Sequence, residues 1–366
     1  MPISNKTNKT NKTNKTNKTN KTNKTNKTGL EDDELASLGQ ESSLALSDAL
    51  QSAMLSVPQA ASPLTAADMA AFAAPAANPA SRARGFRALN GRHLEVLAVS
   101  ALTAGLTVRG TTASSADLSD GTTRLVTLSV DRGDAAFWTR QIADLRARKW
   151  HRDDRLTEIV LQQTDILSFL ALVLPVGSGT HPWLELVLDL LFSAIMRPEV
   201  EMKAALPMPR PQVVSADIAP VIQTPAHSAF PSGHATEAFC VATMLGLLFP
   251  ARRAALRALA VRVAVNRSYA GVHYPVDDHA GAIFGDMLAG VFAKRLFGAQ
   301  IVQTSPVDFA AAAVQPMPAV VGAGLEDYAT SGLVLLPGAW PAPTRPARAP
   351  AVLAWLADEV LTELGR

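Results

Sequence analysis

Two stretches of this 366-residue chain decide its fold: QTPAHSAFPSGHATEAFCVA at residues 223–242 and NRSYAGVHYPVDDHAGAIFGD at residues 266–286. Together they hold four of the seven histidines. The first stretch passes through Ser232, a good N-cap residue, into a predicted helix over Gly233–Phe249. The second has proline at the first turn of a predicted helix over Pro275–Phe297, and Gly298 follows that helix.

Helical periodicity dominates the rest of the chain from Arg84 onward. It predicts further helices at Asp134–Arg148, Asp153–Leu172, Trp183–Met196 (ending near Arg197-Pro198), Arg253–Ser268 and Ala351–Leu364. One short strand is expected at Arg124–Val130, where β-branched residues alternate weakly with polar ones. This pattern predicts an all-α fold, a helical bundle with the functional site between its helices.

The net charge of +2 hides an acidic body. Asn-Lys-Thr repeats eight times between Asn5 and Thr28, so residues 29–366 carry 2 − 8 = −6. That balance argues against a nucleic-acid partner. No stretch reaches the roughly 20 mostly apolar residues of a membrane span, and the N-terminus lacks a signal-peptide pattern. We therefore expect a soluble body without a transmembrane segment and a cytoplasmic location. Cys240, the one cysteine, is expected in the core.

Two basic residues upstream of the first stretch have the spacing K-x6-R-P. Arg210 stands in Pro207-Met208-Pro209-Arg210-Pro211, where the prolines hold the backbone extended and give the guanidinium a defined direction. A guanidinium makes bidentate hydrogen bonds to phosphate-like groups, and Lys203 adds a compact charge. Each residue by itself is equally typical of an ordinary surface base.

Arg267 continues an apolar stripe of its predicted helix. Val263, Ala260 and Leu256 lie four, seven and eleven residues before it, on the same face. An arginine on such a face points inward, and burying an unpaired cation costs several kcal/mol, so Arg267 needs an anionic partner. Either an internal salt bridge to an acidic side chain or a bound anion meets that need.

The motif Pro231-Ser232-Gly233-His234 opens a helix, whose first-turn amides form an anion site. Gly233 lets the backbone approach closely, Ser232 offers a hydroxyl, and His234 is placed as a proton donor. The alternative is a capped helix that carries a histidine by chance.

His273 precedes a helix start, and Asp277 lies in the first turn of that helix. An aspartate that binds one imidazole nitrogen fixes the tautomer and leaves the other nitrogen able to attack. Alternatively, Asp277 only favours the helix N-terminus, which Asp278 does equally well. The spacing R-x5-H-x3-D favours Asp277.

These three motifs, in this order, resemble those of the superfamily of type 2 phosphatidic acid phosphatases, bacterial acid phosphatases and vanadium-dependent haloperoxidases. The resemblance is to a soluble bacterial-type member of that superfamily. The resemblance covers roughly Asp134–Phe297. It implies an all-helical fold with an oxyanion pocket between helices. The implied oxyanion ligands are Lys203, Arg210, Ser232, Gly233 and Arg267, with His273 as nucleophile, Asp277 as its orienting group and His234 as acid–base partner. The family usually has serine before the third-motif arginine, where this chain has Asn266.

Two functions are compatible with the resemblance. The first is hydrolysis of a small phosphate monoester through a phosphohistidine, without a cofactor. The second is a haloperoxidase that binds vanadate on His273 and uses halide and hydrogen peroxide. Ala235 favours the second, whereas Gly271-Val272-His273-Tyr274-Pro275 is more typical of the phosphatases.

The same reasoning divides the chain into four parts. We expect a disordered Asn-Lys-Thr tail at residues 1–28, an Ala/Pro-rich linker at 29–82, the helical catalytic domain at 83–300, and a C-terminal extension with a final helix at 301–366.

Overall fold

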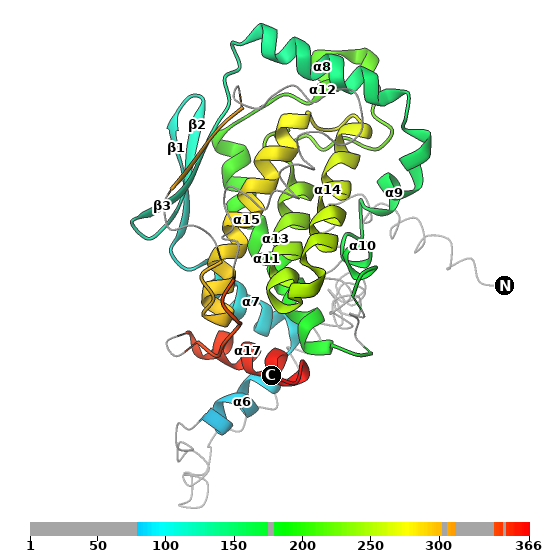
Figure 1. The fold of residues 1–366 in the computed structure, drawn as a ribbon. Coiled ribbons are helices and arrows are strands. Elements are labelled where there is room, and N and C mark those ends of the chain that lie inside the picture. Colours follow the sequence, from blue (N-terminus) through cyan, green and yellow to red (C-terminus); the bar gives the residue numbers. More distant parts are fainter. Residues whose placement is uncertain (1–78, 175–178, 302–305, 312–339, 347–348) are drawn as a thin grey trace, which may run out of the picture.

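The computed structural model describes residues 79–174, 179–301, 306–311, 340–346 and 349–366. The tail predicted at 1–28 and nearly all of the linker predicted at 29–82 lie outside this range. Within it, the long helices lie side by side as a bundle (Figure 1), and they are α11 (Pro182–Ala205), α13 (Gly233–Leu248), α14 (Arg253–Tyr269) and α15 (Pro275–Phe297). All four of these helices carry motif residues, so the fold brings the motifs together in one body.

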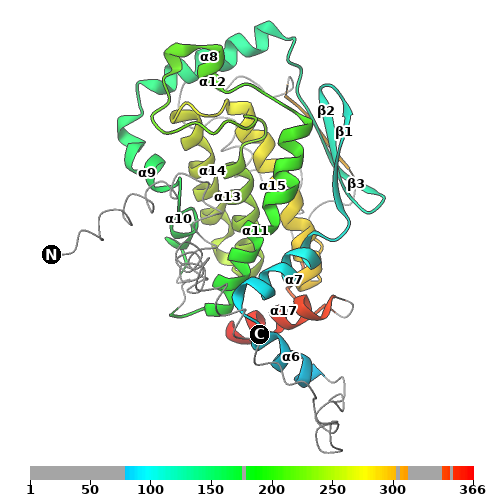
Figure 2. The ribbon, with the colours of Figure 1, turned by 180° about the vertical axis from the view of Figure 1, so that it is seen from behind.

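Helix α13 lies at the centre of the bundle. Every residue from Ala235 to Leu248 is buried, because α11, α14 and α15 all pack on it. Seen from the opposite side, α11 lies in front of α13 (Figure 2). Two glycines of α15 allow a close approach, since a Cβ added at Gly281 would lie 2.5 Å from the carbonyl oxygen of Ser232. A Cβ at Gly285 would lie 2.4 Å from that of Thr236, so α13 and α15 are in backbone contact.

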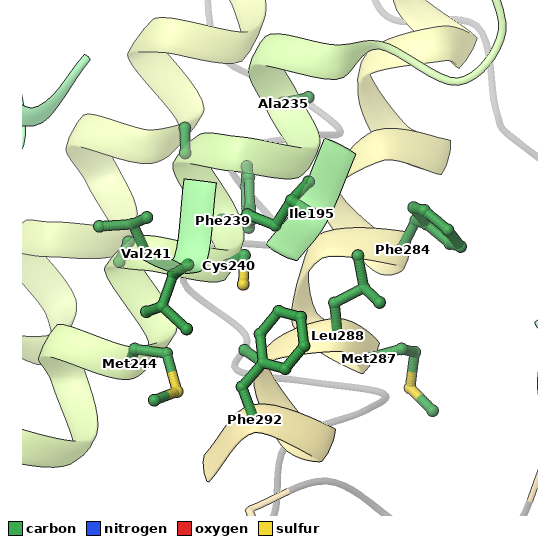
Figure 3. Close-up of a cluster of buried hydrophobic side chains, with 14 of the residues drawn as sticks. Ile195, Ala235, Phe239, Cys240, Val241, Met244, Phe284, Met287, Leu288 and Phe292 are labelled. Atoms are coloured by element: carbon green, nitrogen blue, oxygen red, sulfur yellow. The ribbon is translucent and has the colours of Figure 1, made fainter. Parts of the chain in front are cut away.

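The middle of the bundle is apolar. Side chains from three helices meet there (Figure 3), and those labelled are Ile195 of α11, Ala235, Phe239, Cys240, Val241 and Met244 of α13, and Phe284, Met287, Leu288 and Phe292 of α15. All are buried. Burial raises the pKa of the Cys240 thiol well above its usual value, which keeps it neutral within this core.

The prediction of an all-α fold is wrong, because a four-stranded sheet lies along one flank of the bundle (Figure 1). Strands β1 (Leu106–Thr112), β2 (Ser115–Asp120) and β3 (Thr123–Ser129) form an antiparallel meander, and β4 (Val307–Ala310) pairs parallel to β3. The buried positions alternate with period two, at Ala116 and Leu118 in β2 and at Val126 and Leu128 in β3. Strand β3 corresponds to the strand predicted at Arg124–Val130. The other three strands were not predicted, because each has only two or three apolar positions, too few to indicate a strand by themselves.

The remaining helices close the two ends of the bundle (Figure 1). Helices α6 (Pro79–Arg87), α7 (Gly91–Thr103) and α17 (Ala351–Glu363) lie at one end, and α8 (Ala135–Lys149) and α12 (Pro211–Val214) lie at the other. Short helical segments connect the long ones, and they are η1 (Asp153–Arg155), α9 (Leu156–Leu161), α10 (Leu167–Ala171), η2 (Ala216–Ile218) and η3 (Pro250–Arg252). The motif residues lie towards the α8–α12 end.

Two predicted helices differ from the structure. Helix α11 does not end near Pro198 but continues to Ala205, because Ala194, Pro198 and Met202 are all buried on one face and packing outweighs the lost backbone hydrogen bond. The helix predicted at Asp153–Leu172 is broken into η1, α9 and α10, with Gln162 ending α9. The continuation of α11 places Lys203 on a helix. Gln162, at the end of α9, is buried against the bundle.

Candidate active site

Lys203 comes from the last turn of α11 and is buried, with an exposed fraction of 4%. Its Nζ donates hydrogen bonds to the carbonyl oxygens of Pro231 and, at 3.4 Å, Ser228. Glu199, one turn earlier on α11, has Oε1 at 3.9 Å from that Nζ. Lys203 therefore adjoins the Pro-Ser-Gly-His loop and faces the start of α13.

Arg210 and His273 are in direct contact. Arg210 precedes α12 in extended backbone, as the prolines around it predicted. Its Nη1 donates to the carbonyl oxygen of Val272 at 2.8 Å and contacts Nε2 of His273 at 3.0 Å. A guanidinium has no acceptor, so Nε2 must be the acceptor and carry the lone pair. Nη2 of the same guanidinium lies 3.2 Å from Nδ1 of His227.

Asp277 holds the other side of the His273 ring. Its Oδ2 lies 3.1 Å from Nδ1 of His273 and also accepts a hydrogen bond from the backbone nitrogen of Tyr274 at 2.9 Å. An oxygen that already accepts from one donor is best matched by an Nδ1 that carries hydrogen. The two contacts fix the same tautomer, with hydrogen on Nδ1 and the lone pair on Nε2.

The charges around this pair set its protonation. Burial, and then the positive charges of Arg210 and Lys203, hold the pKa of His273 well below its ordinary value. Burial raises the pKa of Asp277 to about 7, against the lowering effects of the Tyr274 amide and the same two cations. The imidazole is therefore neutral at physiological pH, as a nucleophile requires.

The start of α13 supplies the second motif. Ser232 is fully buried at the N-cap position, and Gly233 begins the helix. A Cβ at Gly233 would lie 2.5 Å from Oε1 of Glu199, so the glycine makes room for this carboxylate of α11. His234 is half-buried, and its Nε2 lies 3.1 Å from the main-chain oxygen of Gln162. Its charge lowers the pKa of His273, which places the two imidazoles in one electrostatic environment.

Arg267 is buried near the end of α14, with an exposed fraction of 1%. Its Nη2 donates to the carbonyl oxygen of Ile159 at 3.2 Å and to Oε1 of Gln162 at 3.0 Å. Its Nε and Nη1 are buried and have no hydrogen-bond partner among the described residues. Burial lowers the pKa of Arg267 to about 10, so the side chain stays charged at neutral pH. Two donor nitrogens, Nε and Nη1, are thus available to an anion.

Several residues around the motifs were not anticipated. Asp278 is buried and accepts a hydrogen bond from Oγ of Ser268, and burial raises its pKa well above the usual value. Glu199 could have been suspected from its spacing of four residues from Lys203 on one helix. Gln162 carried no sequence signal, because a segment far from the motifs brings it to the site. His227 lies in the first stretch quoted above but in none of the three motifs.

The arrangement fits a tetrahedral oxyanion. Three cations, the unpartnered donors of Arg267, and the lone pair of His273 Nε2 all lie at one end of the bundle. Phosphate and vanadate share this shape and charge, and both accept hydrogen bonds from guanidinium groups. The geometry therefore offers anion binding together with a neutral imidazole nucleophile, and it does not separate the two anions.

Comparison with known proteins extends this description. The family model of the PAP2 superfamily matches residues 183–300, as the motifs predicted. No curated protein matches the chain. Among solved structures, a match is the first transmembrane PAP2-type phosphatidylglycerolphosphate phosphatase from Bacillus subtilis. It is 22% identical, with a TM-score of 0.35, and the match covers 43% of this chain and 84% of that one.

The predicted cytoplasmic location is corrected: neither the PAP2 family match nor the transmembrane protein among the solved structures supports it. Among the described residues, no helix combines the length and apolar character that a membrane crossing requires.

Proposed function

We propose that this protein hydrolyses phosphate monoesters through a phosphohistidine on His273, because the family model of the PAP2 superfamily matches residues 183–300. The family match supports phosphoester hydrolysis in general. One observation carries the finer proposal: the His273 ring is held between Asp277 at Nδ1 and Arg210 at Nε2. That arrangement leaves a lone pair on Nε2 of a buried, neutral imidazole.

In the first step, Nε2 of His273 attacks phosphorus, the N–P bond forms, and the bond from phosphorus to the ester oxygen breaks. His234 gives the leaving oxygen a proton. Lys203, Arg210 and Arg267 stabilise the equatorial oxygens as their charge redistributes. Arg210 exchanges its contact with Nε2 for a phosphate oxygen, which releases the lone pair when substrate binds.

In the second step, water attacks phosphorus and the N–P bond breaks. His234, now neutral, accepts the proton from water. Inorganic phosphate leaves, and His273 returns to its neutral form with hydrogen still on Nδ1. Asp277 holds the ring in the same orientation through both steps, because Nδ1 never loses its partner.

The proposal is tested by rapid-quench labelling with a radiolabelled aryl phosphate. Wild-type protein is expected to form an acid-labile phosphoenzyme, and His273→Ala none. His234→Ala should slow cleavage of esters with poor leaving groups by about 10²–10⁴-fold, because these depend most on protonation. With an activated aryl phosphate it should still accumulate label.

His279→Ala is the matched control, because His279 is a buried histidine on α15 whose Nδ1 contacts the carbonyl oxygen of Pro275. It should be labelled like wild type. Label retained in His273→Ala and lost in His234→Ala would mean that the two roles are reversed.

The second candidate, a haloperoxidase, uses the same residues. Lys203, Arg210, Ser232, Gly233 and Arg267 would hold vanadate, and Nε2 of His273 would bind it; the two unpartnered donors of Arg267 fit it as well as phosphate. Bound vanadate would supply peroxide activation. Bromide oxidation with peroxide and added vanadate, without phosphate-ester hydrolysis by the vanadate-free protein, would favour this candidate.

A further inference from the structure

Gln162 lies at the centre of the candidate site although no motif includes it. It ends α9 and is fully buried between α13 and α14. Its side-chain Oε1 accepts hydrogen bonds from Nη2 of Arg267 and from Nδ2 of Asn266, both at 3.0 Å. Its main-chain oxygen lies 3.1 Å from Nε2 of His234. One residue thus contacts a cation of the third motif and the histidine of the second.

The contact with Gln162 determines which donors of Arg267 remain. Nη2 is used by Gln162 and by the carbonyl oxygen of Ile159, while Nε and Nη1 have no partner among the described residues. Because a guanidinium is planar and rigid, fixing Nη2 on two acceptors fixes the direction of the other donors. Arg267 is therefore held in one orientation before any anion arrives.

Asn266 binds the same segment. Its Nδ2 donates to Gln162 and, at 3.1 Å, to Oε2 of Glu158, and its Oδ1 accepts a hydrogen bond from Nη1 of Arg155 at 3.0 Å. These three partners all lie in or directly after η1 and α9. Asparagine at the position where the resembling family usually has serine therefore fastens α14 to the segment that carries Gln162.

We propose that Gln162 is a positioning residue of the oxyanion site, with Asn266 as its anchor. Gln162 orients Arg267 through its amide oxygen and His234 through its main-chain oxygen. A neutral amide suits this place, because a carboxylate there would form an ion pair with Arg267 and compete with the anion. This inference rests on the proposed function, since it assumes that Arg267 binds the oxyanion of the substrate.

The test measures orthovanadate binding by calorimetry for wild type and three variants of the full chain. In Gln162→Ala we expect the dissociation constant to rise about tenfold, the scale of a lost hydrogen bond to a charged group. Gln162→Glu keeps the size of the side chain and an acceptor oxygen for Arg267, but it adds a negative charge. Vanadate should therefore bind this variant more weakly still. Gln163→Ala, the neighbour whose Nε2 donates to the carbonyl oxygen of Val160, should bind like wild type.

A Gln162→Ala variant that stays folded separates positioning from a merely structural role, because a structural role predicts wild-type vanadate affinity in such a variant. Thermal unfolding of the same samples shows whether each variant is folded. Unchanged or tighter binding in Gln162→Ala would overturn the proposal, because Gln162 would then only fill space that the anion takes. Failure of wild type itself to bind vanadate would instead overturn the oxyanion site and the proposed function.

A double-mutant cycle tests the anchor. Asn266→Ser should weaken vanadate binding in the wild-type background. In the Gln162→Ala background the same substitution should weaken binding less, because its effect acts through Gln162. Equal effects of Asn266→Ser in both backgrounds would remove Asn266 from the proposal.

Discussion

Two buried arginines of α14 differ in how the fold compensates the cost of burying a cation. Arg257 donates from Nη1 and Nη2 to the two carboxylate oxygens of Asp286, both at 3.0 Å, and from Nη1 to Oγ1 of Thr243 at 2.9 Å. Arg267, further along the same helix, forms no salt bridge within the described part of the chain and keeps two donors without partners. The cost of burying Arg257 is met by a paired carboxylate, whereas Arg267 has only the more distant charges of Asp278 and Glu237.

The first test of this difference is Arg257→Met, which leaves the carboxylate of Asp286 buried without its cation. We expect the free energy of unfolding to fall by about 3–5 kcal/mol, the usual cost of removing one partner of a buried pair. Urea denaturation measures it. Arg262→Met, also on α14, breaks an exposed pair with Glu158 of α9 and should cost less than about 1 kcal/mol. Equal losses in the two variants would mean that burial does not decide the difference.

The same substitution at the other arginine should affect binding and spare stability. Arg267→Met is expected to weaken vanadate and phosphate binding by about 2–5 kcal/mol, because it removes a buried charge from the anion. Its free energy of unfolding should change less than that of Arg257→Met, since no salt bridge is broken. Calorimetry and urea denaturation measure the two quantities. If Arg267→Met bound vanadate as well as a variant of the exposed Arg252, the functional assignment would be wrong.

Both arginines pack near the contact between α13 and α15. Two glycines of α15 allow a test of that contact. Gly281→Ala and Gly285→Ala should each destabilise by about 1–3 kcal/mol, because the added Cβ meets a backbone oxygen of α13. Gly281→Ala should also weaken vanadate binding, since its Cβ would push on Ser232. Gly85→Ala is the control, because nothing lies within 4 Å of its Cβ position. Wild-type stability in both α15 variants would contradict this packing.

The most gradual expected effect, spread over about three pH units, is a pH dependence of stability at the site end. Burial raises the pKa of Asp277 to about 7, whereas the pKa of an aspartate in an unfolded chain is about 3.9. Between these values the folded state holds a proton that the unfolded state has lost. The stability contributed by this proton is present below the lower value and is lost as pH rises through about 7, by up to about 1.4 kcal/mol per pH unit.

Asp277→Asn should remove that slope while keeping the fold. Urea denaturation of wild type and variant between pH 4 and 8 gives the difference in free energy of unfolding. The variant should gain stability relative to wild type as pH rises. A difference that stays constant across this range would show that Asp277 is ionised throughout.

Some of the site could be predicted because its parts are close in sequence. The contact of His273 with Asp277 spans one helical turn, and the inward direction of Arg267 follows from the apolar stripe before it. The sheet could not, because its buried face is shared by four short strands, of which β4 comes from the far end of the chain. The continuation of α11 past Pro198 also depended on neighbouring helices, whose packing outweighs the local preference.

The sequence alone is enough to predict that the motif residues lie at helix starts and on buried helix faces, because helical periodicity and N-terminal capping act over a few residues. The tertiary structure determines that Arg257 pairs with Asp286 and that Arg267 has no salt bridge among the described residues, since both arginines lie on inward faces of one helix. It also decided that Gln162 contacts both Arg267 and His234. Such partners come from segments separated by long stretches of chain, and which of them meet depends on how the whole core packs.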